Sequence, residues 1–360
     1  MVSLKVSCVN FNRIFIAYFV GKLHLLTEFN LILFISIISM DVIAQSDEKK
    51  DSTTIKSYID KVIVKTNIDS KFDSYVIGSS DGSDLRLVAN NEYRMFLSLD
   101  YEFIGVSVGF APKILPINND DNLKGKTAFS DYNFRFFLGG WTSQIQYQKV
   151  QGFYIENTNE FIEDWVKGRD EYLQLPGLRT LFFGGSTSYV LNPKFSLRNV
   201  VYNTEWQLKS AGSFVPTINY GYSKLSNDLE GENIFEKSFE ISLSPNYYYT
   251  YVIAENWFLS TYISPSFGVR FAREGENGTS NGSRNVYWPV SLDGGIQLGY
   301  SAERWIFGAN LNFESTWYRE DVMTRVENDV VYAKIYFGYR FDAPKVVQKP
   351  FDWMNEKLGL

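Results

Sequence analysis

The chain has 360 residues, 17% of them aromatic, with a formal net charge of −6 and a mean hydropathy of −0.18. This acidity argues against nucleic acid as a partner, because proteins that bind phosphate backbones carry a basic patch. After residue 45 no apolar run approaches 18 residues, which excludes a bundle of membrane helices. High aromatic content with middling hydropathy is typical of a membrane barrel, in which only every second residue faces lipid.

Residues 1–44 are predicted to be a signal peptide. Lys22 supplies positive charge, residues 29–40 form an apolar core, and small residues precede a cleavage site after Ala44. A permanent N-terminal anchor is the alternative. The only cysteine, Cys8, and the only histidine, His24, both lie in this leader. If the leader is removed, no disulfide, thiol nucleophile, histidine-based metal site or Ser/His triad can form.

Residues 45–70 are expected to be a periplasmic N-terminal segment, in which residues 51–65 form a short capped helix that leads into an extended piece. From residue 71 to residue 341 the chain alternates between apolar and polar positions, as a strand with one lipid face requires. In residues 331–341, for example, the odd positions are Val, Ala, Ile, Phe, Tyr and Phe, whereas the even positions are Tyr, Lys, Tyr, Gly and Arg. Many such runs are long enough to cross a bilayer at a tilt.

The number of alternating runs cannot equal the number of wall strands. Thirteen runs can be counted, including 71–78, 84–100 and a run at 195–209 with a bulge near residues 198–199. Termini on the same side of the membrane require an even number. One run is therefore split, spurious or outside the barrel. We predict an all-β, antiparallel transmembrane β-barrel of about 12 strands, with ten and fourteen as alternatives.

The connections fall into two sizes. Short ones lie at 101–102, 139–140, 192–194, 254–256 and 302–304, and long polar ones lie at 112–125, 155–176, 226–235, 274–284 and 319–328. Short periplasmic turns and long outer loops are the asymmetry of a membrane barrel. We therefore expect the protein to lie in the cell outer membrane of a Gram-negative bacterium.

Several blocks of sequence resemble a known family. They are DSTTIKSY at 51–58, FLGG at 137–140, GFY at 152–154, YVLNPKFS at 189–196 and EWQLKSAGSF at 205–214. With this spacing the chain, over about residues 50 to 341, resembles an uncharacterised domain-of-unknown-function family of outer-membrane barrels in Bacteroidota. The block at 205–213 is the most specific. The resemblance implies the fold and the location, and it implies no activity and no catalytic residues.

The alternation places a set of charged side chains in the lumen. They are Arg94, Asp100, Arg135, Arg198, Glu205, Arg270, Asp293, Glu314, Lys334 and Arg340. In one interpretation they pair with one another and fill the barrel as a polar core. In the other, the lumen is incompletely filled and passes small polar or anionic solutes. We expect a structural barrel or a narrow channel of this kind.

The outer loops hold the side chains on which a hydrolase or a binding function would depend. No catalytic residue, metal or cofactor is expected, although a carboxylate pair in the outer loops remains an alternative for a hydrolase; the candidates are Glu160, Glu163, Asp164, Asp170 and Glu171. The main alternative is a binding module, in which the loop at 155–176, with Phe161, Trp165 and Tyr172, engages a polysaccharide or a partner protein. Expected partners are outer-membrane lipid and the barrel-assembly machinery, which would read Phe341 as the terminal aromatic.

Residues 342–360 form a tail after the last predicted strand. Pro344 and Pro350 end the strand, and Phe351, Met354 and Leu358 share one face of a predicted short helix. Two outcomes are open for this periplasmic tail: a helix docked at the mouth of the barrel, or a frayed end.

Overall fold

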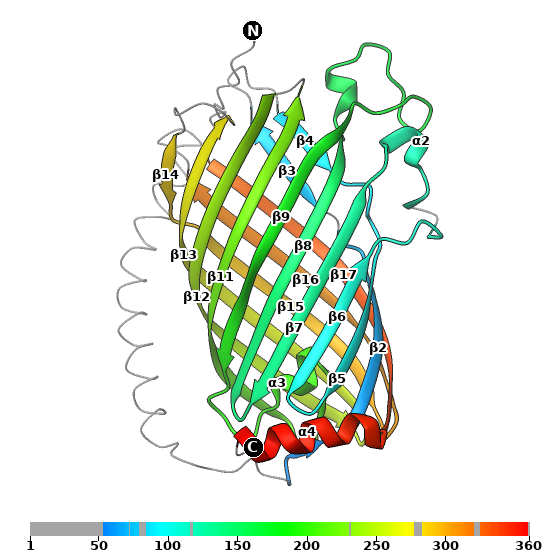
Figure 1. Ribbon diagram of the computed structural model, residues 1–360, viewed down its shortest axis with the longest axis vertical. Helices are drawn as coiled ribbons and strands as arrows, with labels where there is room; N and C mark the ends of the chain where they lie inside the picture. Colours follow the sequence, from blue (N-terminus) through cyan, green and yellow to red (C-terminus); the bar gives the residue numbers. More distant parts are fainter. Residues whose placement is uncertain are drawn as a thin grey trace.

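The computed structural model describes residues 53–71, 73–78, 84–115, 118–229, 232–276, 283–319 and 325–358. The predicted signal peptide, residues 1–44, lies outside these residues. Within them the chain forms a closed antiparallel barrel of twelve strands (Figure 1). The predicted fold class is confirmed. No helix in the described part of the chain is long and apolar enough to cross a membrane.

The barrel closes because its first strand pairs with its last. The strands are β2 (Lys61–Asp69), β5 (Arg94–Tyr101), β6 (Ile104–Phe110), β7 (Ala128–Leu138), β8 (Trp141–Ile155), β9 (Gln174–Tyr189), β11 (Ala211–Leu229), β12 (Glu232–Ala254), β13 (Trp257–Glu276), β15 (Val290–Ser301), β16 (Trp305–Arg319) and β17 (Arg325–Asp342). Each pairs with the next in this order, and β17 returns to β2 through a register that joins Lys334 to Asp69 and Asp342 to Lys61. No strand edge is left open along this circuit.

The boundaries of the barrel differ from those expected. The first wall strand is β2, so the wall begins at Lys61 rather than at residue 71. The helix predicted within 51–65 is wrong, because a strand at Ile55–Ser57 lies there, whereas the extended piece expected after the helix is present as the start of β2. The run at 71–78 contributes β3 (Ser74–Gly78), which forms a hairpin with β4 (Asp84–Val88). This hairpin pairs only with the end of β8, through Leu87 and Val88. Two of the thirteen predicted runs, 71–78 and 195–209, are thus not wall strands, and β2 had been missed.

The period-two alternation sorts the wall into two faces. Apolar side chains on the outer face are exposed, such as Ile335 (57%), Phe267 (59%) and Leu243 (55%), while their neighbours Tyr336, Ser266 and Ser244 are buried. Successive residues of a strand point to opposite faces, which explains the strict exchange. The outer face is the lipid-facing belt of a membrane barrel.

The two ends of the barrel differ as predicted. Short turns at residues 102–103, 139–140, 255–256 and 302–304 gather at one end, here called the short-turn end, and the C-terminal helix lies there too (Figure 1). The opposite end, the loop end, carries the β3–β4 hairpin and the loop from Glu156 to Leu173. Two predicted long loops were wrong: β11 and β12 pair as far as Leu229 and Glu232, and β16 and β17 as far as Arg319 and Arg325.

The connection between β9 and β11 is the largest departure from the expected barrel. The two strands approach a hairpin, where the Asn192 side-chain amide donates to the Gly212 carbonyl (2.7 Å). Residues 193–210 then leave the wall, and we call them the inner segment. They form α3 (Leu197–Val201) and β10 (Glu205–Gln207). The strand and bulge predicted at 195–209 are wrong, because Ser196 caps a helix by accepting a hydrogen bond from the Asn199 amide (2.9 Å).

The inner segment is paired with the start of the described chain. β10 forms a two-stranded antiparallel sheet with β1 (Ile55–Ser57), in which Lys56 lies opposite Trp206. Trp206 in turn packs edge-on against Phe258 of the wall, with ring centroids 5.4 Å apart. Segments about 150 residues apart in the sequence therefore meet inside the short-turn end.

The tail forms a helix, α4 (Lys345–Leu358), which crosses the short-turn end (Figure 1). Phe351 packs against Tyr101 (centroids 4.8 Å apart) and Phe103 (5.5 Å). The Asn355 amide donates to the Glu102 carboxylate (2.8 Å). The helix thus docks on the β5–β6 turn, which is the first of the two predicted outcomes for the tail. The strand ends at Asp342, before both prolines, and Pro350 lies within the helix.

Candidate functional site in the barrel lumen

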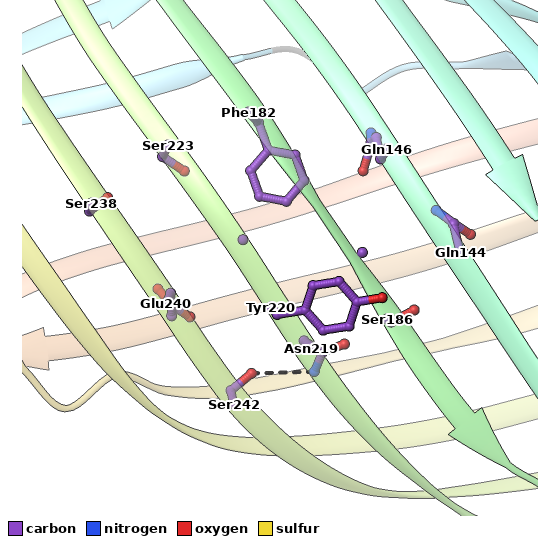
Figure 2. A pocket seen from close by; sticks show the side chains of 12 residues that line it. Gln144, Gln146, Phe182, Ser186, Asn219, Tyr220, Ser223, Ser238, Glu240 and Ser242 are labelled. Carbon is purple, nitrogen blue, oxygen red and sulfur yellow. Dashed lines mark hydrogen bonds between the residues drawn. The ribbon is translucent and has the colours of Figure 1, made fainter.

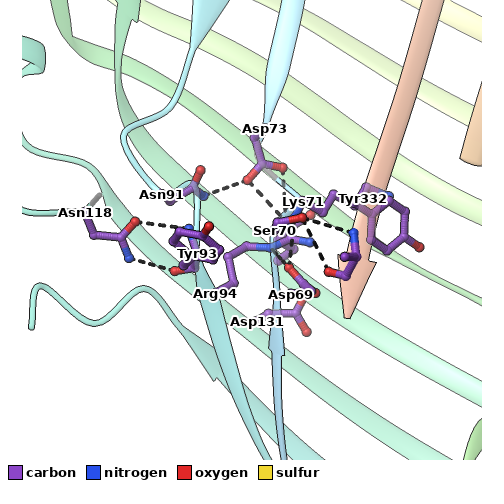
Figure 3. A network of polar contacts seen from close by, with 12 residues as sticks. Asp69, Ser70, Lys71, Asp73, Asn91, Tyr93, Arg94, Asn118, Asp131 and Tyr332 are labelled. Carbon is purple, nitrogen blue, oxygen red and sulfur yellow. Dashed lines mark hydrogen bonds and ion pairs between the residues drawn. The ribbon is translucent and has the colours of Figure 1, made fainter. Parts of the chain in front are cut away.

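The lumen of the barrel holds pairs of opposite charge on adjacent strands. Asp69 of β2 and Arg94 of β5 are direct cross-strand partners, and the Arg94 guanidinium lies 2.9 Å from the Asp69 carboxylate. Both side chains are buried. Asp73 adds a second carboxylate 4.0 Å from Arg94, and it accepts a hydrogen bond from Asn91 (2.8 Å), as Figure 3 shows. These contacts anchor the β3–β4 hairpin to the wall.

A second pair, Asp100 and Arg135, spans a whole strand. The two side chains lie on β5 and β7, with Gly105 of β6 aligned between them, and their charged groups are 2.9 Å apart. A Cβ atom at position 105 would stand 2.1 Å from the Asp100 carboxylate and 2.8 Å from Arg135 Nε. The ion pair therefore requires glycine at this position.

Three further predicted lumen residues lie toward the loop end. Glu314 binds Lys71 (2.5 Å) and accepts a hydrogen bond from the Tyr332 hydroxyl (2.9 Å). Asp293 is the cross-strand partner of Glu314. Arg270 binds Glu236 on the neighbouring strand (2.5 Å). These residues lie where the alternation predicts.

Arg198 and Glu205 are not on the wall. Both belong to the inner segment, where they form an ion pair of 3.5 Å with each other. Glu205 also accepts a hydrogen bond from the Ser196 hydroxyl (2.6 Å), and Arg198 donates to the Gly139 carbonyl (3.3 Å). Their charges therefore stabilise the inner segment and its contact with the β7–β8 turn.

Arg340 joins the inner segment to the wall. Its guanidinium donates to the carbonyls of Asn203 (2.8 Å) and Ala302 (2.5 Å) and to the Ser301 hydroxyl (3.0 Å). It also stacks on the Tyr58 ring, 3.9 Å from its centroid. With 1% of its surface exposed, Arg340 holds the inner segment and the N-terminal strand together.

Lys65 of β2 makes the second attachment. Its ammonium group donates to the Tyr202 carbonyl (3.0 Å) and to the Asn203 side-chain oxygen (3.1 Å). Lys65 and Asp69 were missed because residues 45–70 were assigned to a periplasmic segment. The signal was present: Val64, Thr66 and Ile68 alternate with Lys65, Asn67 and Asp69.

Two polar cavities adjoin each other in the lumen. One, of about 300 Å³, is lined by β8, β9, β11 and β12, with Gln144, Gln146, Asn219 and Glu240 among its side chains (Figure 2). The other, of about 180 Å³, has residues 200–203 of the inner segment on one side, and its remaining lining comes from β2, β5, β6, β7, β8, β15, β16 and β17. Gln144 lines both. The barrel interior is thus polar and incompletely filled, and its short-turn end holds the inner segment.

The loop end carries a third cavity, outside the lumen. It has a volume of about 500 Å³ and is lined by Arg86, Glu156, Asn157, Asn159, Glu160, Trp165 and Lys167. Trp165 donates to the Glu171 carbonyl (2.8 Å) and packs on Tyr172, which is buried. Phe161 is 41% exposed. Of the three predicted binding aromatics, Tyr172 thus belongs to the packing of the loop.

Two of the five predicted outer-loop carboxylates, Asp170 and Glu160, are engaged in local contacts. Asp170 accepts hydrogen bonds from Arg169 and from the Val166 amide, which lower the pKa of its carboxyl to about 2. Glu160 accepts a hydrogen bond from the Asn157 amide (2.9 Å). The described residues hold no group of three or more His, Cys, Asp or Glu side chains suited to a metal ion.

Phe341 lies at the end of the last strand. It pairs with Val62 across the β17–β2 ladder and packs against the small core formed by Val62, Tyr101 and Ala343. The C-terminal helix contributes Val347 and Phe351 to the same core. The terminal aromatic of the barrel is therefore partly covered in this structure.

Together these observations define a transmembrane β-barrel with a polar lumen and an internal segment at its short-turn end. Residues 49–341 match the family described as Domain of unknown function (DUF4421), and the chain belongs to that family. No curated protein matches the chain.

Solved structures share the barrel architecture at low identity. OmpT of Vibrio cholerae is 11% identical, with 82% of this chain and 100% of OmpT covered and a TM-score of 0.31. LpxR from Salmonella typhimurium is 9% identical, with coverages of 78% and 100% and a TM-score of 0.29. The ferric yersiniabactin uptake receptor FyuA from Yersinia pestis is 9% identical, with coverages of 81% and 44% and a TM-score of 0.25. Similarity at this level carries no information about a shared activity.

Proposed function

We propose that this protein is an outer-membrane barrel that admits small polar solutes into its lumen, with the inner segment as a plug at the periplasmic end. Gram-negative outer membranes hold barrels of this kind, with short turns on the periplasmic side. Its lipid partners would contact the outer belt, and the assembly machinery would act at the β17 end near Phe341.

The inner segment is the observation that carries this proposal. A lumen meant only as a packed core needs no 18-residue excursion from a wall hairpin, whereas a conduit needs a closure. The closure is attached to the rest of the barrel through Arg340 and Lys65, through the β1–β10 pairing, and through Trp206 and Arg198, and one polar cavity lies directly beside it. Polar groups on the lining can take the place of part of the hydration shell of a small solute.

The test is conductance with the plug removed. Residues 193–210 are replaced by an Asn-Gly turn, which the proximity of Asn192 and Gly212 accommodates. We expect small conductance from the wild type in planar bilayers and larger, steady steps from the deletion variant. A folded deletion variant with unchanged conductance would contradict the proposal and favour a structural barrel.

A matched pair of point variants refines this test. Arg340→Met removes the contacts to Asn203, Ser301 and Ala302 and should produce intermittent openings. Arg304→Met is the control, because Arg304 lies in the adjacent turn and its side chain donates only a long hydrogen bond, of 3.5 Å, to Tyr339 on the outer side of β17. Its backbone carbonyl, which accepts from the Arg340 amide, is kept in the variant. The control should behave as the wild type.

We propose further that the protein is not an enzyme. The low pKa of Asp170 removes one outer-loop carboxylate as a general acid at neutral pH. The wild-type protein should release no product from oligosaccharide substrates, and measurable hydrolysis lost in Glu163→Gln would contradict this.

A second candidate function is binding at the loop end. It is favoured by the cavity of about 500 Å³, which combines Trp165 with two cations, two carboxylates and two amides, a polar lining with an aromatic ring that is suited to a polysaccharide or to a polar segment of a partner protein. Binding to immobilised polysaccharide, lost in Lys167→Ala and retained in the barrel variant Arg304→Met, would support it.

A further inference from the structure

The cavity beside the inner segment has an excess of positive charge. Its lining contains three cations, Lys65, Arg135 and Lys334, and one carboxylate, Asp69. Arg135 is neutralised by Asp100, and Asp69 by Arg94. The two lysines are left without a carboxylate partner among the described residues.

Lys334 is the clearest case. It lies opposite Asp69 across the β17–β2 ladder and opposite Asn310 on the other side. Asp69, however, is engaged by Arg94 at 2.9 Å, and no described carboxylate comes within 4.0 Å of the Lys334 ammonium group. The hydrogen-bond acceptors of Lys65 are neutral oxygens, those of Tyr202 and Asn203, and its ammonium group also lies 5.9 Å from the centroid of the Tyr336 ring.

Further polar groups line the cavity together with these two ammonium groups. The Arg135 Nε group is buried without a hydrogen-bond acceptor, in a residue only 6% exposed. Asn67, Asn133 and Asn310 contribute amide groups to the same lining. An unpaired ammonium group in a confined polar site is costly, and an anion that accepts several hydrogen bonds relieves that cost.

We propose that this cavity binds a small oxyanion such as phosphate, held between Lys334 and Lys65 with Arg135 behind them. A volume of about 180 Å³ accommodates a tetrahedral oxyanion with several waters. Residues 200–203 of the inner segment form one side of the site, so the anion contacts the plug directly. The inference rests on the proposed role of the lumen and names its solute class.

Binding is measured on the full mature chain, folded in detergent, by equilibrium dialysis against radiolabelled phosphate. We expect saturable binding by the wild type. Lys334→Met should weaken it about ten-fold or more, because a charge-assisted contact is lost. Lys71→Met is the matched control: Lys71 is also a lumen lysine, but it is already paired with Glu314 and lies outside the cavity lining.

A second variant guards against misfolding. Lys334→Arg retains the charge, and it should restore most of the affinity, while the heat-dependent gel mobility of a folded barrel verifies all variants. Absence of saturable phosphate binding in the folded wild type overturns the proposal. So does equal loss in Lys71→Met, or no loss in Lys334→Met. Sulfate and acetate as competitors distinguish a tetrahedral oxyanion from a carboxylate as the preferred ligand.

The dialysis result is independent of conduction. Phosphate binding without any opening of the plug-deletion variant would remove the proposed conduit and leave the anion site. Larger conductance of the deletion variant, with no phosphate binding by the wild type, would remove the proposed anion site and leave the conduit.

Discussion

Two sides of the lumen are built from different chemistry. The side formed by β2, β5, β6 and β7 carries buried ion pairs, such as Asp69 with Arg94 and Asp100 with Arg135. The side formed by β11, β12 and β13 carries the Arg270–Glu236 pair toward the loop end, and below it hydroxyl and amide groups, such as Thr250 with Ser260 (2.7 Å) and Asn246 with Thr217 (2.9 Å). The larger cavity, of about 300 Å³, extends over β8, β9, β11 and β12, on the hydroxyl side.

The two sides differ in how completely their side chains fill the lumen. Long charged side chains reach across a strand to each other and fill the volume between them, and removing one member of such a pair leaves a costly unpaired charge. Short hydroxyl side chains satisfy one another along the wall and leave the centre free. We therefore expect the charged side to determine stability and the hydroxyl side to tolerate change.

The largest effect is expected from Asp100→Asn. Asp100 is fully buried, and its loss leaves the Arg135 charge without compensation, which should lower the free energy of unfolding by about 3–5 kcal/mol. Denaturant unfolding in lipid vesicles measures the change. The double variant Asp100→Asn/Arg135→Met should recover part of the loss. A single variant as stable as the wild type would show that the pair is solvated in the lumen.

Gly105→Ala tests the Asp100–Arg135 ion pair through the glycine that lies between its two members. The added methyl group would meet the Asp100 carboxylate and Arg135, so that one of them must move. We expect a loss of about 1–3 kcal/mol of unfolding free energy. Ser107→Ala is the control, since it removes atoms at the next lumen-facing position of β6. Equal stability of the two variants would argue against the spacer role.

On the hydroxyl side, Thr250→Val should cost less. It leaves the buried Ser260 hydroxyl without its partner, and the expected loss is about 0.5–1.5 kcal/mol. Adding Ser260→Ala should give little further loss, because both partners are then gone. A loss above that of Asp100→Asn would reverse the ranking of the two sides.

The smallest effect is expected at the exposed pair Lys56–Glu303, which links β1 to the β15–β16 turn (2.6 Å). The hydrogen bond from Lys56 holds the pKa of the Glu303 carboxyl below its usual range. A carboxyl whose pKa is lowered by folding stabilises above its unfolded pKa, and this contribution is lost as the pH falls through the folded pKa. Glu303→Gln should therefore change stability by about 0–1 kcal/mol at pH 7 and by nothing at pH 2.

Most of the wall could be predicted from the sequence because a strand exchanges faces at every residue. Ile335 and Lys334 were assigned to opposite faces from the pattern alone, and the hairpin at residues 139–140 was read from its two glycines. Lipid outside and polar groups inside impose this alternation on every strand. Local sequence therefore determined the fold class and the lumen-facing positions of the wall.

The inner segment could not be predicted in this way. Val200, Tyr202, Thr204 and Trp206 show the alternation of a wall strand, yet they fold into a helix and a strand inside the barrel. Their partners are β1, Lys65 and Arg340, which are brought to them only when β17 pairs with β2. The unpaired state of Lys334 has the same origin, because it depends on the preference of Asp69 for Arg94 across another ladder. The sequence by itself thus determined which residues of the wall face inward. Closure of the barrel decided which of them meet, because contacts between distant segments follow from topology rather than from local pattern.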